Sequence, residues 1–406
     1  MADDANEAGK ARRGRPPSVL QVVPSLVSGG VERGTIDLAG ALAAAGWTAY
    51  VASAGGPMEA LLARAGARHL TLPLASKNPL VIARNAAALA KLIRHHRIDI
   101  VHARSRAPAW SAWAAARRTG RHFVTTFHNA YDTSALPLKR HYNSVMAKGE
   151  RVIAISQFVG EHAAATYGIG GDRLRVIPRG VDLALFDPAR VRGDRVAALA
   201  EAWRVPEETR VVMLPGRLTR WKGGIDLIEA VARLGRRDLC CLLVGTEQRP
   251  GFRRELEAAI ERAGLVGLFR IVEDCRDMPA AYALADVVVS ASTDPEGFGR
   301  VIVEAQAMGR PVIATDHGGA RETVDPGVTG WLAPPGDPAA LAEAIGAALA
   351  LDQAAQAAYA RRARAHVASS YTGALMCART IEVYEELLFP APAAAPAARE
   401  PLPIVA

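Results

Sequence analysis

Two successive series of strand and helix signals, separated by a break near residues 177–188, constrain the fold more than any other feature of this sequence. Short β-branched and apolar runs alternate with longer amphipathic segments, which is the pattern of a parallel sheet covered by helices on both faces. The strand candidates are residues 19–23, 49–53, 69–72, 98–102, 123–127 and 152–155, and then 211–214, 239–244, 269–272, 287–290, 312–315 and 331–333. The sequence therefore predicts an α/β fold with two doubly wound parallel sheets and a cleft between them. Such sheets bind ligands at the carboxyl ends of their strands.

Chain length agrees with two domains. The 406 residues are too many for one ordinary domain. We expect an N-terminal domain over residues 19–187, a C-terminal domain over 188–370 and a last helix within 371–388. Residues 1–18 are polar and charged and residues 389–406 are rich in Pro and Ala, so both predict disordered tails.

Composition argues against several classes of protein. Hydrophobic residues make up 50% of the chain, yet no uninterrupted apolar stretch reaches the ~20 residues of a membrane span, and we recognise no secretory signal. Four cysteines occur, and they fit neither a metal-binding spacing nor an obvious disulfide framework: Cys240, Cys241, Cys275 and Cys377. We therefore expect a reducing, cytoplasmic setting.

Charge is divided unevenly along the chain. Residues 1–190 carry a net charge of +12 and the remainder −4, within a total of +8. The basic half predicts contact with an anionic membrane surface, an anionic glycolipid or nucleic acid, with a solvated basic surface as the alternative. Residues 13–16, Arg-Gly-Arg-Pro, look like a DNA minor-groove hook, but a single copy on a tail leads us to expect no nucleic-acid partner. Trp110 and Trp113, on the helix that ends at Arg117, fit either an interfacial contact or a packed core.

The segment DPEGFGRVIVE at residues 294–304 places two carboxylates, Glu296 and Glu304, eight positions apart. A strand candidate precedes it, and we expect a helix to open at about Phe298, with Glu304 about two turns inside. The unpaired N–H groups and partial positive charge of a helix N-terminus suit a phosphate. The two carboxylates would bracket such a ligand and accept hydrogen bonds from its hydroxyls; the alternative is a capping Glu and a solvated Glu.

This segment resembles the signature of retaining family-4 glycosyltransferases, which have the GT-B fold: Glu, then Phe-Gly, then a second Glu eight residues after the first. The resemblance covers roughly residues 19–388 and is stronger in the second half. It implies that Glu296 faces the donor sugar, that Glu304 holds the ribose of the nucleotide, and that the last helix crosses back to the first domain. It also places a stretch of donor-binding residues between the carboxylates: Gly297, Phe298, Gly299 and Arg300. Arg300 departs from the more usual neutral residue, and we expect it either to touch the diphosphate or to project into solvent.

A second loop, PGRLTRWKG at residues 215–223, follows the first strand of the second series. Gly216 permits a tight turn, and Arg217 and Lys222 are spaced to clamp a diphosphate whose charge grows as the glycosidic bond breaks. The family's Gly-Arg…Lys-Gly element implies the same role, although a basic loop without function is the alternative. Since the chain contains no Asp-x-Asp element, we expect these cations to neutralise the diphosphate with no metal and no cofactor.

Other positions complete the candidate site. Gly29 and Gly30 permit close backbone approach to a ligand, and the family has a Gly-Gly loop near the donor phosphate and the acceptor. His128 ends a strand and is predicted to hydrogen-bond a sugar hydroxyl or the reacting centre; the family often has Thr-x-His there. The alternative is a structural histidine, and His102 and His122 are competing candidates. Arg276 lies where the family lodges the nucleobase. Glu322 is expected to stabilise a helix or loop.

Together these features predict a retaining glycosyltransferase that moves a hexose from a nucleotide-diphosphate sugar to a bacterial surface glycan or glycolipid, such as lipopolysaccharide. The acceptor class rests on the resemblance and on the basic first half of the chain. Two alternatives remain: a GT-B phosphorylase or nucleotide-sugar epimerase, and a catalytically silent nucleotide-sugar-binding protein. Transfer of label from donor to acceptor would separate the enzymes, and the intact carboxylates and cations argue against the silent protein.

Overall fold

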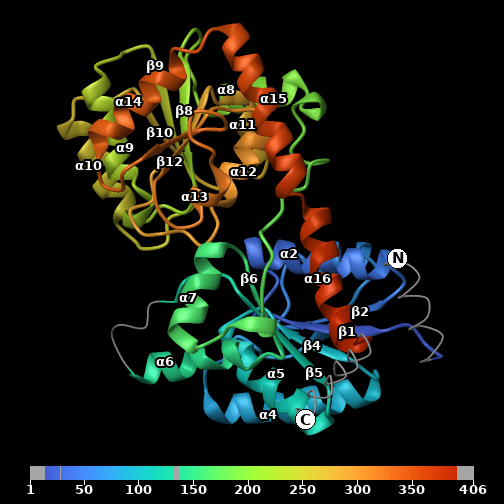
Figure 1. The fold of residues 1–406 in the computed structure, drawn as a ribbon. Coiled ribbons are helices and arrows are strands. Elements are labelled where there is room, and N and C mark those ends of the chain that lie inside the picture. Colours follow the sequence, from blue (N-terminus) through green and yellow to red (C-terminus); the bar gives the residue numbers. More distant parts are fainter. Residues whose placement is uncertain (1–13, 28, 132–136, 391–406) are drawn as a thin grey trace, which may run out of the picture.

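The computed structural model describes residues 14–27, 29–131 and 137–390, which form two α/β units stacked one above the other (Figure 1). Each unit is built on a sheet whose neighbouring strands all run parallel. The predicted fold class, two doubly wound parallel sheets, is confirmed. Arg13 of the Arg-Gly-Arg-Pro segment and most of both expected tails lie outside the described residues.

The first unit has a seven-stranded sheet in the order β3-β2-β1-β4-β5-β6-β7. Its strands are β1 (Ser18–Val22), β2 (Thr48–Ser53), β3 (Arg68–Thr71), β4 (Ile100–Ala103), β5 (His122–Phe127), β6 (Arg151–Ala154) and β7 (Leu174–Val176). Its helices are α2 (Gly30–Ala44), α3 (Glu59–Arg64), α4 (Pro79–His95), α5 (Arg106–Thr119), α6 (Pro137–Asn143) and α7 (Gln157–Tyr167), with short 3-10 turns η1 (Ser144–Lys148) and η2 (Gly171–Arg173). The three-residue strand β7, which pairs with β6, was not predicted.

The second unit has a six-stranded sheet in the order β10-β9-β8-β11-β12-β13. Its strands are β8 (Arg210–Pro215), β9 (Leu239–Val244), β10 (Phe269–Val272), β11 (Val287–Ser290), β12 (Val312–Thr315) and β13 (Trp331–Ala333). The helices of this half of the chain are α8 (Gly193–Ala202), α9 (Gly224–Leu234), α10 (Phe252–Arg262), α11 (Met278–Leu284), α12 (Arg300–Ala307), α13 (Ala320–Thr323), α14 (Pro338–Leu349), α15 (Gln353–Ser370) and α16 (Gly373–Leu388), with 3-10 turns η3 (Pro188–Arg190) and η4 (Arg220–Lys222).

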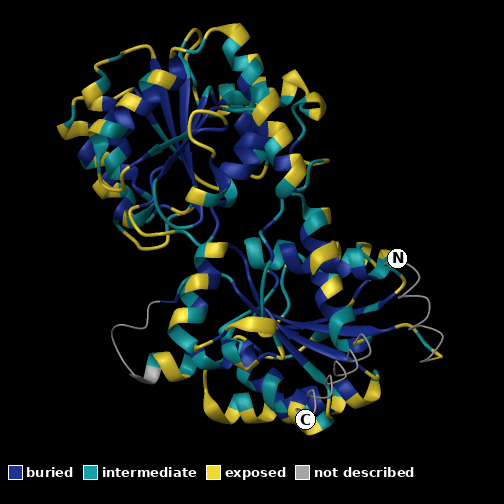
Figure 2. Ribbon diagram, in the orientation of Figure 1, coloured by how far each residue is buried: buried dark blue, intermediate teal, exposed yellow. Residues whose placement is uncertain are grey.

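The central strands are buried on both faces, as Figure 2 shows by their dark blue colour in both units. Every residue of β1 and of β9 is buried. Helices on the two faces of each sheet exclude water from these strands, which explains why β9 is a continuous apolar run with no alternation of polar and apolar residues.

Strand order reverses between β1 and β4 in the first sheet and between β8 and β11 in the second. The crevice at such a reversal, beyond the carboxyl ends of the strands, is where a doubly wound sheet binds ligands. The loops after β1 and β4 carry Gly29 and Arg104, and the loops after β8 and β11 carry Gly216 and Glu296. The topology therefore places these four residues at the two reversals.

The chain crosses between the units twice, and the two crossings touch. Val181, on the way into the second unit, forms a parallel bridge with Thr372 on the way back. Helix α16 then packs against α2 of the first unit, so the red and blue helices lie side by side in Figure 1. Tyr384 Oη on α16 lies 2.6 Å from His102 Nδ1 on β4, which anchors the returning helix in the first unit's core.

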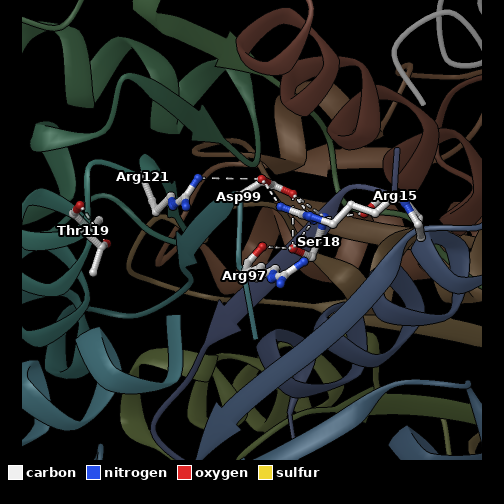
Figure 3. Close-up of polar contacts among 8 residues, drawn as sticks. Arg15, Ser18, Arg97, Asp99, Thr119 and Arg121 are labelled. Atoms are coloured by element: carbon white, nitrogen blue, oxygen red, sulfur yellow. Dashed lines mark hydrogen bonds and ion pairs between the residues drawn. The ribbon is translucent and has the colours of Figure 1, made fainter. Parts of the chain in front are cut away.

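A buried carboxylate lies at the amino end of the first sheet, opposite the crevice at the carboxyl ends of β1 and β4. Asp99 is 1% exposed and accepts two hydrogen bonds of 2.9 Å from Arg15 and one of 3.0 Å from the Ser18 backbone N–H (Figure 3). Arg121 lies 3.9 Å away on the other side. Arg15, an arginine of the Arg-Gly-Arg-Pro segment, thus holds the start of β1.

Among the described residues, no helix combines the length and apolar character that crossing a bilayer requires.

Candidate active site

A cleft of about 1180 Å³ lies between the two units at the carboxyl ends of both sheets. Residues from both units line it. Every site residue predicted from the sequence is among the lining residues: Gly29, Gly30, His128, Gly216, Arg217, Lys222, Arg276, Glu296, Gly297, Phe298, Gly299, Arg300 and Glu304. The structure therefore brings together side chains that are spread over almost 300 positions of the sequence.

The ammonium of Lys222 and the carboxylate of Glu296 form an ion pair with an Nζ–Oε1 distance of 2.6 Å. Ser292 Oγ donates to the same oxygen at 2.5 Å, and Ser290 Oγ does so at 3.4 Å. Burial disfavours the charged form of Glu296, but Lys222 and the two hydroxyls outweigh it and lower the pKa of this carboxyl below its ordinary value. Glu296 is therefore a carboxylate at neutral pH.

Both oxygens of Glu304 have partners. Oε1 accepts a 2.6 Å hydrogen bond from Arg300 one turn earlier on α12, and Oε2 accepts a 2.9 Å bond from the Tyr282 hydroxyl. Burial and the adjacent Glu304 charge raise the pKa of Tyr282 well above its ordinary value, so this hydroxyl stays protonated and donates. A ribose hydroxyl reaching Glu304 would join an ordered network rather than a freely rotating side chain.

Helix α12 begins two residues later than expected. Gly299 has φ of 82°, so the backbone at this position is left-handed and cannot continue a helix from Phe298. The helix starts at Arg300, and Glu304 stands about one turn inside it rather than two. Arg300 ion-pairs with Glu304, and a Cβ added to Gly30 across the cleft would lie 3.0 Å from its side chain. It is therefore held between the two units instead of projecting freely into solvent.

Two of the predicted cations, Arg217 and Arg276, lie at the exposed rim of the cleft. Arg217 is exposed and has no ion-pair partner among the described residues; its guanidinium lies 5.9 Å from the Trp221 ring centre. Lys222 Nζ lies 4.5 Å from the same ring, which faces both cations. Arg276 is exposed and hydrogen-bonds Asp274 at 3.0 Å. Arg217 and Lys222 thus flank one aromatic ring and leave Arg217 available to an anion.

His128 faces the cleft from the carboxyl end of β5. Arg179 Nη2 lies 3.1 Å from His128 Nδ1, and Nε2 is buried without a partner that satisfies hydrogen-bond geometry. Burial first, and then the charges of Arg179 and Arg104, lower the pKa of His128 well below its ordinary value. The ring is therefore neutral at physiological pH, and because an arginine can only donate, Nδ1 accepts and Nε2 carries the hydrogen.

Contacts across the cleft were largely missed by sequence reasoning. Ser156 Oγ donates to the Gly297 carbonyl at 2.6 Å. Glu322, expected to be a stabiliser, accepts hydrogen bonds of 2.7 and 2.8 Å from the backbone N–H groups of Gln157 and Phe158 at the start of α7. The carboxylate of one unit thus caps a helix of the other. The sequence indicated a stabilising role for Glu322 itself. It could not indicate the partners, because they lie about 165 positions away.

Two further residues were also missed: Arg179, which lines the cleft, and its neighbour Arg104. Both are buried, and both lie in loops that follow strands of the first unit. The helical Gly34, which has no side chain, gives their guanidinium groups room. The one signal that pointed to Arg104 was its position directly after a strand.

No group of three or more His, Cys, Asp or Glu side chains with a metal-binding arrangement occurs within the ranges that the structure describes. All four cysteines are free thiols.

Comparison with known proteins gives two family matches. Residues 28–185 match Glycosyltransferase Family 4, and residues 209–350 match Glycosyl transferases group 1.

Curated relatives include a D-inositol 3-phosphate glycosyltransferase of Xylanimonas cellulosilytica, 33% identical over 63% of this chain and 64% of its own length. Another protein of that name, from Salinispora arenicola, is 32% identical over 71% of this chain and 68% of its own length. The match spans 58% of a third such relative, from Nocardia farcinica, so this chain covers about three fifths of several relatives.

Solved structures resemble the whole fold. A glycosyltransferase from Rickettsia africae is 39% identical, with a TM-score of 0.85 over 93% of this chain and all of that one. Anabaena HepE in complex with UDP-glucose is 26% identical, with a TM-score of 0.79 over 91% of this chain and 99% of that one.

Proposed function

Because the chain belongs to the family-4, group 1 glycosyltransferases of GT-B fold, we propose that it is a retaining, metal-independent hexosyltransferase that uses a nucleotide-diphosphate sugar. In this reaction an acceptor hydroxyl forms a bond to the anomeric carbon while the bond from that carbon to the diphosphate oxygen breaks. The hydroxyl proton passes to the departing nucleoside diphosphate. Fold membership alone does not fix chemistry, so the proposal rests on the site.

The observation that supports it most is the paired arrangement of Lys222 and Glu296 at the strand-order reversal of the second sheet. A carboxylate fixed beside the sugar can accept its hydroxyls and stabilise positive charge at the anomeric carbon. An ammonium fixed 2.6 Å away, with Arg217 beside it, can neutralise the diphosphate as its charge develops. The carboxylate and cation are thus matched to opposite charges that grow on either side of the same breaking bond.

The nucleotide is assigned by likeness. Anabaena HepE, 26% identical over 91% of this chain, binds UDP-glucose, which makes UDP-hexose our proposed donor. Glu304 would accept hydrogen bonds from the ribose, and the rim residue Arg276 would face the base. The N-terminus of α12 and Gly297 would lie along the diphosphate.

The proposed acceptor is a hydroxyl of a bacterial surface glycan or glycolipid, bound on the side of the first unit. The curated relatives of this chain are named for a phosphorylated inositol acceptor, so a small phosphorylated cyclitol is the alternative acceptor. The basic first half of the chain agrees with either anionic class.

The experiment is a ligand-stabilisation screen of the purified chain with UDP-, GDP- and ADP-sugars, followed by transfer of radiolabel from the best donor to candidate acceptors. Stabilisation by one nucleotide sugar, with label appearing in an acceptor and free nucleoside diphosphate appearing in equal amount, is the expected result. Label that returns only as sugar phosphate would indicate a phosphorylase, and binding without any turnover of the donor would indicate a silent binding protein.

A further inference from the structure

Two arginines of the first unit converge behind the cleft. Arg104, directly after β4, is 4% exposed, and Arg179, in the segment that leaves the first unit after β7, is 6% exposed. A Cβ added to Gly34 on α2 would collide with Arg179 Nη1 and would lie 3.3 Å from Arg104 Nη2. Two guanidinium groups from distant parts of the chain therefore reach the same small space beside one helical glycine.

Neither guanidinium has an ion-pair partner within 4.0 Å among the described residues, since the ion pairs of this region involve other cations. Arg104 donates to Gln21 Oε1 at 3.0 Å, and its Nε is buried without a partner. Arg179, which lines the cleft, makes one side-chain hydrogen bond in the part of the chain described, to His128. Each group thus retains N–H donors that no protein acceptor satisfies.

The nearby carboxylates do not neutralise the pair directly. Asp37 is hydrogen-bonded to Arg33 at 3.0 Å, and Glu304 is taken by Arg300. Glu32, on the same helix as Gly34, lies beyond ion-pair distance, and burial raises its pKa. The buried charge of Asp99, by contrast, is compensated, because it accepts hydrogen bonds from both ends of the Arg15 guanidinium and from a backbone N–H (Figure 3).

Like charges gathered in a buried place are unfavourable. Burial, followed by repulsion from Arg104 and then Arg300, lowers the pKa of Arg179 to about 9. A buried cation without a counter-charge is costly, and a protein retains it only where something compensates. An anion bound between the groups would remove that cost.

We propose that Arg104 and Arg179 form a subsite for an oxyanion, either carboxylate or phosphate, carried by a sugar or cyclitol substrate of this enzyme. An oxyanion fits because two guanidinium groups meet beside Gly34, and the N–H groups of a guanidinium match a carboxylate or a phosphate. This inference rests on the proposed transferase function.

Two sources fit the chemistry: a uronic-acid donor, whose carboxylate is on the sugar ring, or an acceptor that carries a phosphate ester. The position of Arg179 in the cleft wall admits both. The experiment must therefore present the anion on each substrate separately.

The test measures thermal stabilisation of the full chain with UDP at saturation, so that the proposed diphosphate clamp is already occupied. Inorganic phosphate, glucose 6-phosphate and inositol phosphate are titrated against potassium chloride at equal ionic strength, with glucose and inositol as neutral counterparts. Separately, without UDP, the affinity for UDP-glucuronate is compared with that for UDP-glucose. The variants are Arg179→Met, Arg104→Met and Arg179→Lys, with Arg237→Met as the control. Arg237 is an exposed arginine just before β9, at the amino end of the second sheet.

We expect at least one anionic sugar or cyclitol to bind ten times more tightly than its neutral counterpart, and Arg179→Met and Arg104→Met each to abolish that preference. Arg237→Met should keep it. Because methionine removes an uncompensated buried charge, the two Met variants should fold with a melting temperature no lower than the wild type. Should either fail to fold, Arg179→Lys keeps a charge but loses the planar fork and should weaken the preference at least tenfold. Preference for UDP-glucuronate identifies the donor as the source, and preference for a phosphorylated sugar or cyclitol identifies the acceptor.

No preference for any anionic substrate, phosphate binding without binding of an anionic sugar or cyclitol, or a preference that survives in folded Arg179→Met would each overturn the inference. The proposed function fails differently, through absence of UDP or UDP-sugar binding in the wild type. Nucleotide binding that is intact while the anion preference is missing would leave the transferase assignment standing and remove only the subsite.

Discussion

Lys222 Nζ and Glu296 Oε1 lie 2.6 Å apart, so the cation that follows β8 neutralises the carboxylate that follows β11 across the strand-order reversal of the second sheet. Each residue fixes the position of the other before any donor enters the cleft. A site whose charges are already oriented loses little energy to reorganisation when the leaving group begins to depart. The mutual pairing also means that removal of either residue changes the ionisation or the position of its partner.

Replacement of either cation that we assign to the diphosphate should nearly abolish turnover. We expect Lys222→Ala and Arg217→Ala each to reduce kcat by at least ~100-fold, the usual cost of losing one electrostatic stabiliser. Arg220→Ala is the matched control, because Arg220 lies in the same loop but pairs with Glu255 at 2.6 Å and is 76% exposed. Steady-state assays of sugar transfer measure the effect, and near-normal turnover in both cleft variants would remove the clamp role.

Transfer should survive chelation of divalent metals. The chain has no Asp-x-Asp element, and Arg217 and Lys222 supply positive charge where a metal would otherwise be needed. The assay compares initial rates with and without excess EDTA. Complete loss of transfer that Mg²⁺ or Mn²⁺ restores would contradict the metal-free assignment.

Replacement of Glu304 and replacement of Glu296 should have different effects on nucleotide binding. Glu304→Ala should weaken binding of both the free nucleoside diphosphate and the nucleotide sugar, because we assign the ribose to Glu304. Glu296→Ala should impair transfer and leave the affinity for free nucleotide largely intact, because we assign the sugar to Glu296. Calorimetric titration with UDP distinguishes them, and equal losses of affinity in the two variants would rule out the division of roles.

Stability should fall as pH drops below about 6.5, partly because of His128. Burial lowers the pKa of His128 well below the value it has in the unfolded chain, so between the two values the unfolded state binds a proton that the folded state does not. That difference destabilises the folded state by up to about 1.4 kcal/mol for each pH unit. His128→Gln should reduce the slope of unfolding free energy against pH from 6.5 to 5, measured by urea denaturation. An unchanged slope would show that His128 is protonated in the folded protein.

The basic first unit should bind anionic membranes. Its cations contribute roughly 1 kcal/mol each near an acidic bilayer, and the attraction fades within a Debye length of about 8 Å at physiological salt. Arg117 lies 5.0 Å from the ring centre of Trp113, so α5 presents cations and an aromatic together. Liposome co-sedimentation should rise with the fraction of anionic lipid and fall with salt.

The matched variant replaces four basic residues with Gln: Arg117, Arg118, Lys139 and Arg140. Most of the membrane binding should disappear, while the melting temperature should stay within a few degrees of the wild type, because none of the four is buried. A wild type that ignores acidic liposomes at low salt would favour a soluble anionic acceptor instead.

Sequence patterns located the strands and the donor-side loops, because those features are local. A β-branched run identifies β11, and the residues that follow it identify Glu296, without reference to any distant position. The start of α12 was misplaced because the left-handed Gly299 looks, in sequence, like any glycine near a helix. Strand β7 was missed because its sequence, Leu-Arg-Val, has a charged residue in the middle and forms no apolar run.

The contacts that sequence did not predict all join distant segments. Arg104 and Arg179 meet only after β4 and the crossing segment have been placed beside α2. Glu322 is far in the sequence from the helix that it caps. The chemistry of single residues suggests which side chains could form such contacts. Which of them become neighbours depends on the fold, and a single sequence does not show that directly.

The returning helix α16 has a consequence for biosynthesis. Met376, Cys377, Val383 and Leu388 belong to the same hydrophobic cluster as Trp47 and the buried face of α2. These partners are translated only after both sheets, so the first sheet can form while one layer of its core is still missing. Apolar surface on α2 stays uncovered during synthesis of the entire second unit, which is the interval in which a nascent chain most needs protection from aggregation. The half of the molecule that emerges first is therefore the half that is finished last.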